Sequence, residues 1–571
     1  MKSKSKFLSL ILFIVLSAVL IGCTGEGETS SAEDNQDQNE TTETEQGTEG
    51  TEDSEAGDSK QVLNLVEGGD LTTLNSLELM DVLASKTLNN VMEGLYRLDK
   101  NHEPVPGMAE GYEVSSDGST YTFKLREDAV WSNGTPVTAN DFVFAWKRAL
   151  TPETLSPFSY MMNDIKNAAE IQNQDSELYG AVDELGVEAV DDHTLKVELE
   201  NQIPYFVSLV TYPLFFPQNQ EFVESKGDQY ALEAENLIYN GPFTLTSWDH
   251  GTGWTYEPNK DYWDREAVKL DKIEVKIASD NSTRVSLYEA GEIDMTEITS
   301  EFVTKYAGHE DYTHVLKPEV YFMRINQTNK YLANENIRRA IDMGWDKAGV
   351  AESLLNNGSV PANYLVPKEF AFSPSGEDFR AKYPEFNNEG VEAAQDYWQQ
   401  GLSELGVDSI ELELISYEDD QRGNVAAFIK NQLETNLEGL TIQIQNLPNK
   451  VKLNREVEMD YDLSYGGWNP DYQDPMTFVD LFVTDGTSNL TGYSDEKFDE
   501  LVLEAKTDTA DLDKRWENLQ EAERILIEED VAISPMYQSG QAMLTKPYVK
   551  DLITHPFGVF GSYKWTYIEG K

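Results

Sequence analysis

A single cysteine, Cys23, limits how this chain can reach a stable fold. A lone cysteine has no partner within its own chain, so an internal disulfide is excluded and stability has to come from a buried core. About 510 residues follow position 60, and a length of this order predicts two or three domains rather than one.

The residues before Cys23 have the pattern of a secretion signal. Three lysines lie within the first six residues, and an apolar run over 7–20 follows them. This pattern predicts a signal peptide over 1–22. The ending Leu20-Ile21-Gly22-Cys23 resembles the bacterial lipobox, which implies that Cys23 is lipidated and becomes the mature N-terminus. The alternative is an ordinary secreted protein with an incidental cysteine.

The segment after Cys23 is strongly acidic. Residues 24–60 contain 13 Asp and Glu against one Lys, and no aromatic or large aliphatic side chain. Such a segment cannot bury enough apolar area to offset its ordering entropy, so we predict a disordered tether over 23–60, extended by self-repulsion. With a lipid on Cys23, it would hold the folded part at the outer face of the cell membrane, as in Gram-positive lipoproteins.

The whole chain carries an unusually negative charge. It has 103 acidic and 44 basic residues, for a formal net charge of −59. A surface this negative repels nucleic acid and anionic lipid, and it discourages self-association, so a monomer is expected. Two interpretations stay open, namely adaptation to saline or alkaline surroundings and general solubility at the cell surface.

Sequence periodicity in the first half of the chain predicts strands and one well-defined helix. Residues 121–126 alternate with period two, as in a half-buried strand. Thr138 and Asp141 match a capping box at the start of a helix. Residues 187–190 and 195–199 are typical of a β-hairpin.

A strand–helix–strand unit is predicted in the second half of the chain. Residues 410–415 and 440–444 have the pattern of strands, and 420–437 that of the helix between them. Such a unit predicts a parallel pair of strands. A third short strand is expected over 461–465, ending at Gly466-Gly467-Trp468. The fold class is therefore α/β with mixed sheets.

The usual signatures of catalysis are missing from the sequence. There is no G-x-S-x-G, H-E-x-x-H, P-loop or dinucleotide-binding glycine pattern. The six histidines lack zinc-site spacing and are expected at the surface or in turns. We therefore expect a binding protein rather than an enzyme, with no metal and no cofactor.

A loop after the third strand is the strongest candidate for ligand binding. Gly466 and Gly467 allow a ligand to approach the backbone closely, and Trp468 is placed to line a pocket. Asp471 follows beyond the strand end, where α/β folds bind ligands. The alternative is a tight structural turn around a packed tryptophan.

Several blocks resemble family 5 of the extracellular solute-binding proteins, the oligopeptide- and dipeptide-binding components of ABC importers. The block from Ala109 to Phe142 resembles the signature region of that family. The likeness runs from about residue 61 to the end, and the Trp468-x-x-Asp471-Tyr472 element is most similar to the oligopeptide-binding branch. Further matching blocks are Asn240–Phe243, Tyr262-Trp263, Gly291–Asp294, Asn336–Ile341 and Gly467–Tyr472.

The resemblance implies a periplasmic-binding-protein-like (type II) fold with two lobes, an extra domain and a hinge between the lobes. Lobe I would comprise 61–92, 217–318 and 538–571. Domain II would be an insertion over 93–216, and lobe III would cover 319–537. The lobes would close over an extended oligopeptide, which the protein would deliver to the permease subunits of an ABC importer.

The resemblance also implies roles for single residues. The peptide main chain would add as a strand beside Gly466–Trp468, and Asp471 would hold its terminal ammonium. On this reading Asp471 matters more than Asp474. Val82 matches a further backbone contact, and Phe158 takes a position usually held by an aromatic residue near the ligand.

Two arginines depart from the family pattern, and the solute itself has alternatives. Arg422 stands where the best-known binder of the family has a histidine, and Arg324 replaces an acidic residue. Each either meets a peptide carboxylate or is a solvated surface charge. The same fold could instead bind a dipeptide, a nickel complex or a sugar. A surface hydrolase or adhesin is a further alternative.

Overall fold

The computed structural model describes residues 60–571, except 79–80, 300 and 487. The predicted signal peptide, Cys23 and all of the predicted tether except Lys60 lie outside the described residues. The described residues from 60 onward belong to one compact unit. Within the described part of the chain, no helix combines the length and apolar character needed to cross a membrane.

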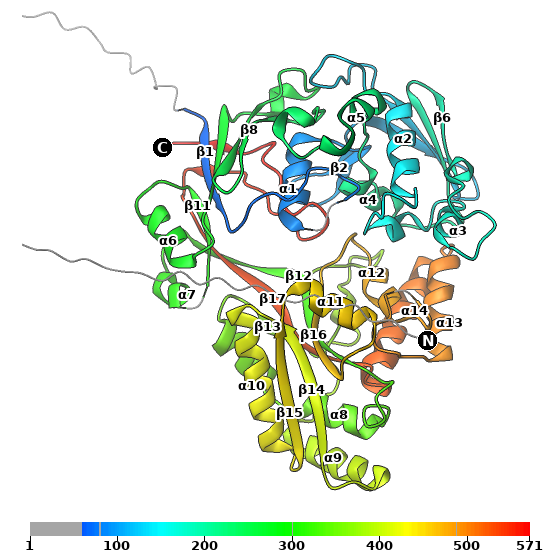
Figure 1. Cartoon of the computed structure of the whole chain (residues 1–571), viewed down its shortest axis with the longest axis vertical. Helices are drawn as coiled ribbons and strands as arrows, with labels where there is room; N and C mark the ends of the chain where they lie inside the picture. Colours follow the sequence, from blue (N-terminus) through cyan, green and yellow to red (C-terminus); the bar gives the residue numbers. More distant parts are fainter. Residues whose placement is uncertain (1–59, 79–80, 300, 487) are drawn as a thin grey trace, which may run out of the picture. The chain divides into compact units, whose positions relative to one another are not determined.

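A four-stranded sheet is built from two of the segments assigned to lobe I. Its order is β1-β10-β9-β8, with β1 parallel to β10 and the other pairs antiparallel. The helix α1 (Val82–Val91) lies beside this sheet in Figure 1. The strands are β1 (Val62–Glu67), β8 (Phe243–Asp249), β9 (Gly253–Pro258) and β10 (Lys272–Ile277).

A second, antiparallel sheet lies in the segment assigned to domain II. Its order is β4-β5-β7-β6, and the predicted strand and hairpin are both confirmed. The capping box of Thr138 and Asp141 begins helix α2 (Ala139–Ala149) as predicted, and α2 buries Phe142 and Trp146. The strands are β4 (Ala109–Val114), β5 (Thr120–Leu125), β6 (Val187–Asp191) and β7 (Thr194–Glu198).

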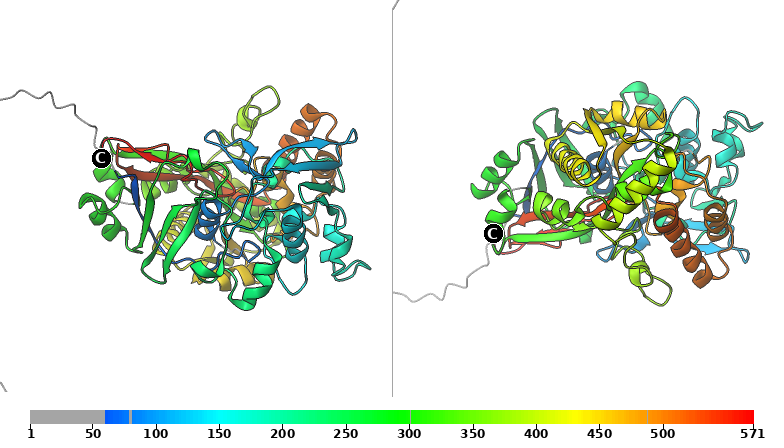
Figure 2. Two further views of the ribbon diagram at one scale, coloured as in Figure 1. Left: turned by 90° about the horizontal axis from the view of Figure 1, so that it is seen from above. Right: turned by 90° about the horizontal axis from the view of Figure 1, so that it is seen from below.

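A third sheet of seven strands is mixed, as predicted. Its order is β11-β17-β12-β16-β14-β15, and β13 (Val360–Pro361) also pairs with β17. The long strands β12 and β17 run through the predicted boundaries between lobe I and lobe III, as Figures 1 and 2 show. The other strands are β11 (Met295–Ile298), β12 (Tyr312–Ile325), β14 (Ile410–Tyr417), β15 (Leu440–Leu447), β16 (Leu463–Trp468) and β17 (Ile533–Thr545).

The strand–helix–strand unit is confirmed, but the strand after it is longer than predicted. Strands β14 and β15 are parallel, and α10 (Asp420–Asn436) connects them. The prediction that the next strand ends before Gly466 is wrong, because β16 continues to Trp468. The reason is tertiary, since residues 466–468 pair with residues 320–322 of β12.

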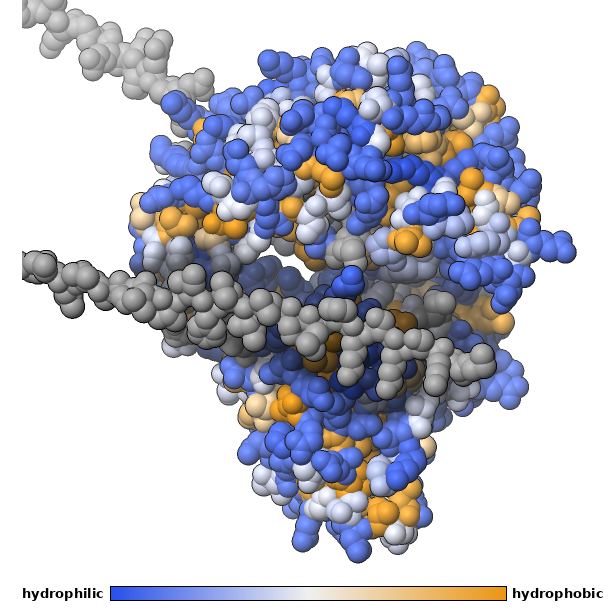
Figure 3. Space-filling model, in the orientation of Figure 1, coloured by the Kyte–Doolittle hydropathy of each residue, from blue (hydrophilic) through white to orange (hydrophobic). Residues whose placement is uncertain are grey.

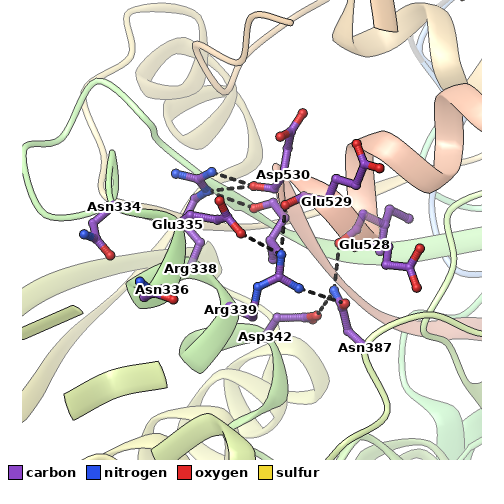
Figure 4. A network of polar contacts seen from close by, with 12 residues as sticks. Asn334, Glu335, Asn336, Arg338, Arg339, Asp342, Asn387, Glu528, Glu529 and Asp530 are labelled. Carbon is purple, nitrogen blue, oxygen red and sulfur yellow. Dashed lines mark hydrogen bonds and ion pairs between the residues drawn. The ribbon is translucent and has the colours of Figure 1, made fainter. Parts of the chain in front are cut away.

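The block Asn336–Ile341 holds a helix in place rather than facing a cavity. Arg338 of α8 (Glu335–Met343) is buried and donates hydrogen bonds to the carbonyl oxygens of Leu332, Ala333, Asp530 and Val531, at 2.5–3.1 Å. Figure 4 shows this network between α8 and the segment that leads into β17. Arg338 therefore connects α8 to the segment that leads into β17.

Candidate ligand-binding site

Two cavities lie beside the end of β16. One of about 790 Å³ is lined by residues from the segments assigned to lobe I and to lobe III, among them Val82, Lys317 and Asn469. One of about 540 Å³ is lined by Tyr321, Arg422, Gly467 and again Asn469. Because Asn469 borders both, the two cavities flank the same strand end. In Figure 3 the visible surface is hollowed between the upper and lower lobes.

The last three residues of β16 leave one edge of the strand available. On one side they pair with β12, whereas β14 reaches only Leu463 and Ser464 among the described residues. The backbone N–H and C=O groups beyond these positions can accept an added strand. A Cβ at Gly467 would lie 2.8 Å from the Tyr321 ring, so this position requires glycine.

Asp471 lies in the loop just beyond β16. Its carboxylate accepts a hydrogen bond of 2.8 Å from the Tyr160 hydroxyl, and no ion pair among the described residues includes it. Burial raises the pKa of Asp471 to about 7, against a smaller lowering by the Tyr160 hydrogen bond. An enclosed carboxylate of this kind is suited to receive a cation.

Aromatic side chains from the segment assigned to domain II lie on one side of this carboxylate, with Tyr160 in direct contact. The Phe158 ring lies 5.4 Å from that of Tyr212 and 6.2 Å from that of Tyr160, centroid to centroid. Burial, and next the charge of Asp471, raise the pKa of both tyrosines well above its ordinary value. A low-polarity wall of this kind strengthens any charge pair formed at Asp471. Half-buried Trp468 donates a 3.2 Å hydrogen bond to Thr477.

Arg422 borders the smaller cavity, near the free edge of β16. Its guanidinium lies 3.0 Å from Asp419 and donates a 3.0 Å hydrogen bond to the Tyr321 hydroxyl. It also lies 4.6 Å from the ring centroid of Tyr417. These contacts hold the guanidinium at the cavity wall, while its side chain keeps 36 % of its surface exposed.

Arg324 belongs to a buried charge cluster inside lobe III. Its guanidinium lies 3.2 Å from the fully buried carboxylate of Glu456, which also pairs with Lys452 at 2.7 Å. A Cβ at Gly466 would lie 1.9 Å from the guanidinium, so the arginine lies directly against β16. Because Glu456 is shared by Arg324 and Lys452, the pairing balances only part of the positive charge of this cluster.

Val82 is the first residue of α1 and is 55 % exposed at the larger cavity. The carboxylate of Asp81 caps this helix by accepting a 2.8 Å hydrogen bond from Ala84 N–H. The structure therefore brings Val82, Arg422, Gly467 and Asn469 to the walls of the two cavities, whereas Phe158 and Asp471 lie beside Tyr160 and line neither cavity.

Sequence reasoning missed residues that the tertiary structure brings to the site. Tyr160 and Tyr321 contact Asp471 and Arg422 from 311 and 101 positions away along the chain. No local sequence signal marks either tyrosine. The expected surface or turn position is wrong for His555, which is only 1 % exposed because it packs against His102.

Comparison with known proteins relates this architecture to a single family. The family model for bacterial extracellular solute-binding proteins, family 5 (middle), matches residues 103–489. The dipeptide-binding protein DppE of Bacillus subtilis is 32 % identical over 566 residues, covering 99 % of each chain. The oligopeptide-binding protein OppA of the same organism is 32 % identical over 546 residues, covering 94 % of each.

Solved structures agree with these relatives. A substrate-binding domain of an oligopeptide ABC transporter from Bacillus anthracis is 43 % identical with a TM-score of 0.80, covering 89 % of this chain and 99 % of that one. Listeria monocytogenes OppA bound to peptide is 40 % identical with a TM-score of 0.79, covering 90 % and 100 %. The likeness confirms the predicted α/β, periplasmic-binding-protein-like fold. The chain belongs to family 5 of the bacterial extracellular solute-binding proteins.

Proposed function

We propose that this protein captures oligopeptides outside the cell and delivers them to an ABC-type permease. The observation that carries the proposal is the state of the Asp471 carboxylate, which has no cationic partner among the described residues and lies just beyond the available edge of β16. A peptide with a free amino terminus supplies an ammonium group to pair with Asp471 and an extended backbone to pair with the edge of β16.

The backbone of residues 466–468 accounts for binding without regard to peptide sequence. A peptide strand added to this edge exchanges main-chain hydrogen bonds, which every peptide can make. Trp468 and Phe158 line the path, and Val82 approaches it from lobe I. The two cavities on either side of Asn469 leave room for varied, hydrated side chains.

Two arginines take different roles in this proposal. Arg422 faces the smaller cavity and is placed to meet a peptide carboxylate. Arg324, paired with Glu456, supports the strand from behind Gly466 and adds positive potential to it. The names of the relatives support peptides over nickel complexes or sugars, and the second cavity favours oligopeptides over dipeptides.

Lipidation of Cys23 fits the same function. A binder that serves a permease has to remain near the membrane, and an acidic tether over 23–60 allows it to reach the permease while its lobes stay free to open and close. We propose a monomer that closes by hinge motion between lobe I and lobe III, along the strands β12 and β17.

Acetylation of the peptide amino terminus is expected to abolish tight binding. Calorimetry with a mixed peptide of about five residues and with its N-acetylated twin measures the effect directly. The acetyl group removes the ammonium charge and leaves the Asp471 carboxylate without a partner, so affinity should fall at least about a hundredfold.

Equal affinities for the two peptides would contradict the role of Asp471. Mass spectrometry of ligands released from the purified protein identifies its natural peptides. An assay for loss of peptide over hours separates binding from hydrolysis, and an intact peptide is the expected result.

Arg422→Gln is expected to weaken binding of peptides with a free carboxyl terminus by about tenfold, because one charge-assisted hydrogen bond at a partly exposed site is lost. Binding of the matching peptide amide should change little. Lys430→Gln on the same helix is the control, since Lys430 pairs with Glu434 of that helix. An equal loss for acid and amide would show that Arg422 acts only on the shape of the cavity.

A further inference from the structure

Two histidines meet at the wall of the larger cavity, away from Asp471. The Nδ1 atoms of His102 and His555 lie 3.1 Å apart, and their rings are inclined by 81°. Both residues line the 790 Å³ cavity. His102 belongs to the turn between β2 (Tyr96–Leu98) and β3 (Pro104–Pro106), whereas His555 belongs to the C-terminal segment.

The backbone of His102 has a left-handed conformation, which is uncommon for residues other than glycine. Its φ of 67° lies in the left-handed region, which favours glycine and costs other residues on the order of 1 kcal/mol. Asp99 fixes the turn by accepting hydrogen bonds from the N–H groups of Asn101 and Glu103, at 2.7 and 3.0 Å. Backbone positions of this kind cluster at ligand-binding and active sites, and His102 lies at a cavity wall.

The second histidine is buried and incompletely paired. His555 is 1 % exposed, and its Nε2 atom has no hydrogen-bond partner in the described structure. Burial lowers the pKa of His555 to about 3, with a further lowering from His102, and burial also lowers the pKa of His102. An ion pair between Lys100 and Asp551 joins the two segments that carry the histidines.

We propose that His102 and His555 bind a late first-row divalent cation, such as Cu²⁺, Ni²⁺ or Zn²⁺, through their Nδ1 atoms. Two metal–nitrogen bonds of about 2.0–2.1 Å span the observed 3.1 Å at an angle of about 100°, between square-planar and tetrahedral geometry. Neutral imidazole is a preferred ligand of these metals, whereas Mg²⁺ and Ca²⁺ prefer oxygen.

The cation would bring its remaining ligands from the cavity. Among the described residues, no group of three or more His, Cys, Asp or Glu side chains could hold a metal ion. Two protein ligands leave coordination positions open toward the cavity. Water, or amino and amide groups of the peptide proposed above as the ligand, would complete the metal shell.

Electron paramagnetic resonance with Cu²⁺ tests this site without any peptide. The sample is the full chain with Cys23→Ser, which removes the only thiol, in excess Mg²⁺ to occupy surface carboxylates. We expect coupling to two imidazole nitrogens, and in calorimetry an affinity order that places Cu²⁺ above Ni²⁺ and Zn²⁺.

His102→Gly is the decisive variant, because glycine suits the left-handed backbone at this position and should preserve the fold. It should lose the two-nitrogen signal and bind Cu²⁺ at least about tenfold more weakly, while a cooperative melting transition shows that the variant is still folded. His314→Ala, at the same cavity, should retain both nitrogens. Oxygen-only coordination, or a spectrum that His102→Gly leaves unchanged, would show that the two histidines merely share a hydrogen bond.

Discussion

Asp471→Asn is expected to weaken binding of a peptide with a free amino terminus by at least about a hundredfold, without making the unliganded protein less stable. Asparagine keeps the shape and the hydrogen bond to Tyr160 but loses the negative charge. The peptide ammonium would then be buried against a neutral amide. Removing one partner of a buried charge pair costs about 3 to 5 kcal/mol, and each 1.4 kcal/mol is about tenfold in affinity.

In the unliganded protein, Asp471→Asn should preserve or raise stability, although it weakens peptide binding. Burial raises the pKa of Asp471 to about 7, above the value of about 3.9 for an unfolded aspartate. The folded state therefore binds the Asp471 proton more tightly than the unfolded state does. The protonated carboxyl makes its full contribution to stability below pH 4, and this contribution is lost as the pH rises through 7. At pH 8 the ionised carboxylate lowers the stability of the folded state, and asparagine removes this cost. The melting temperature of Asp471→Asn should therefore equal or exceed that of the wild type.

Peptide affinity should change with pH in the opposite direction from the Asp471 contribution to stability. Below pH 7 the unliganded carboxyl is increasingly protonated, and binding an ammonium requires this proton to leave. Affinity should therefore fall as the pH is lowered from 7 to 5, a range in which the peptide amino group, with a pKa of about 7.7–8.0, stays protonated, while Asp471→Asn should show a flat profile. The N-acetylated peptide is the matched control, because it should bind wild type and variant almost equally. A variant that loses stability together with affinity would contradict this assignment.

Much of the fold follows from the sequence because local pattern and tertiary structure agree. The capping box at Thr138 and the strand–helix–strand unit over 410–447 both form where periodicity places them. The blocks that carry the family resemblance are largely structural. Asn240 bonds the backbone of Glu93 through its side chain, while Tyr262 and Trp263 donate to the Glu93 carboxylate at 2.7 and 2.5 Å.

The site was less predictable because it depends on contacts between distant segments. Gly466–Trp468 looks like a loop in isolation, and only pairing with β12 makes it a strand with an available edge. Tyr160 reaches Asp471 from domain II, although no feature of residues 155–165 marks it as a ligand-site residue. No local sequence pattern distinguishes Arg324 from Arg422. In the structure, Arg324 pairs with buried Glu456, whereas Arg422 borders a cavity.

Asp474 lies three residues after Asp471 but is expected to govern stability. Its two carboxylate oxygens lie 2.8 and 2.9 Å from the two terminal nitrogens of Arg515 on α14 (Leu512–Arg524). Asp474 and Arg515 are 8 % and 5 % exposed. Asp474 also accepts a 2.9 Å hydrogen bond from Met476 N–H at the start of α12 (Met476–Val479). The pair joins the Asp471 loop to α14.

Asp474→Asn should therefore lower the free energy of unfolding by about 3 to 5 kcal/mol, because the Arg515 charge stays buried without its partner. Urea denaturation measures this loss. The double variant Asp474→Asn/Arg515→Met should lose less than the sum of the single variants, because it leaves no uncompensated charge.

Peptide affinity of the folded Asp474→Asn protein, measured at low temperature, should remain within a fewfold of wild type. Unchanged unfolding in urea would contradict the structural role of the pair, and a hundredfold loss of affinity would assign ligand binding to the wrong aspartate. The two variants thus separate the functions of neighbouring carboxylates: Asp471 is left unpaired within the protein so that a ligand can pair with it, and Asp474 is fully paired so that the loop carrying Asp471 keeps its position.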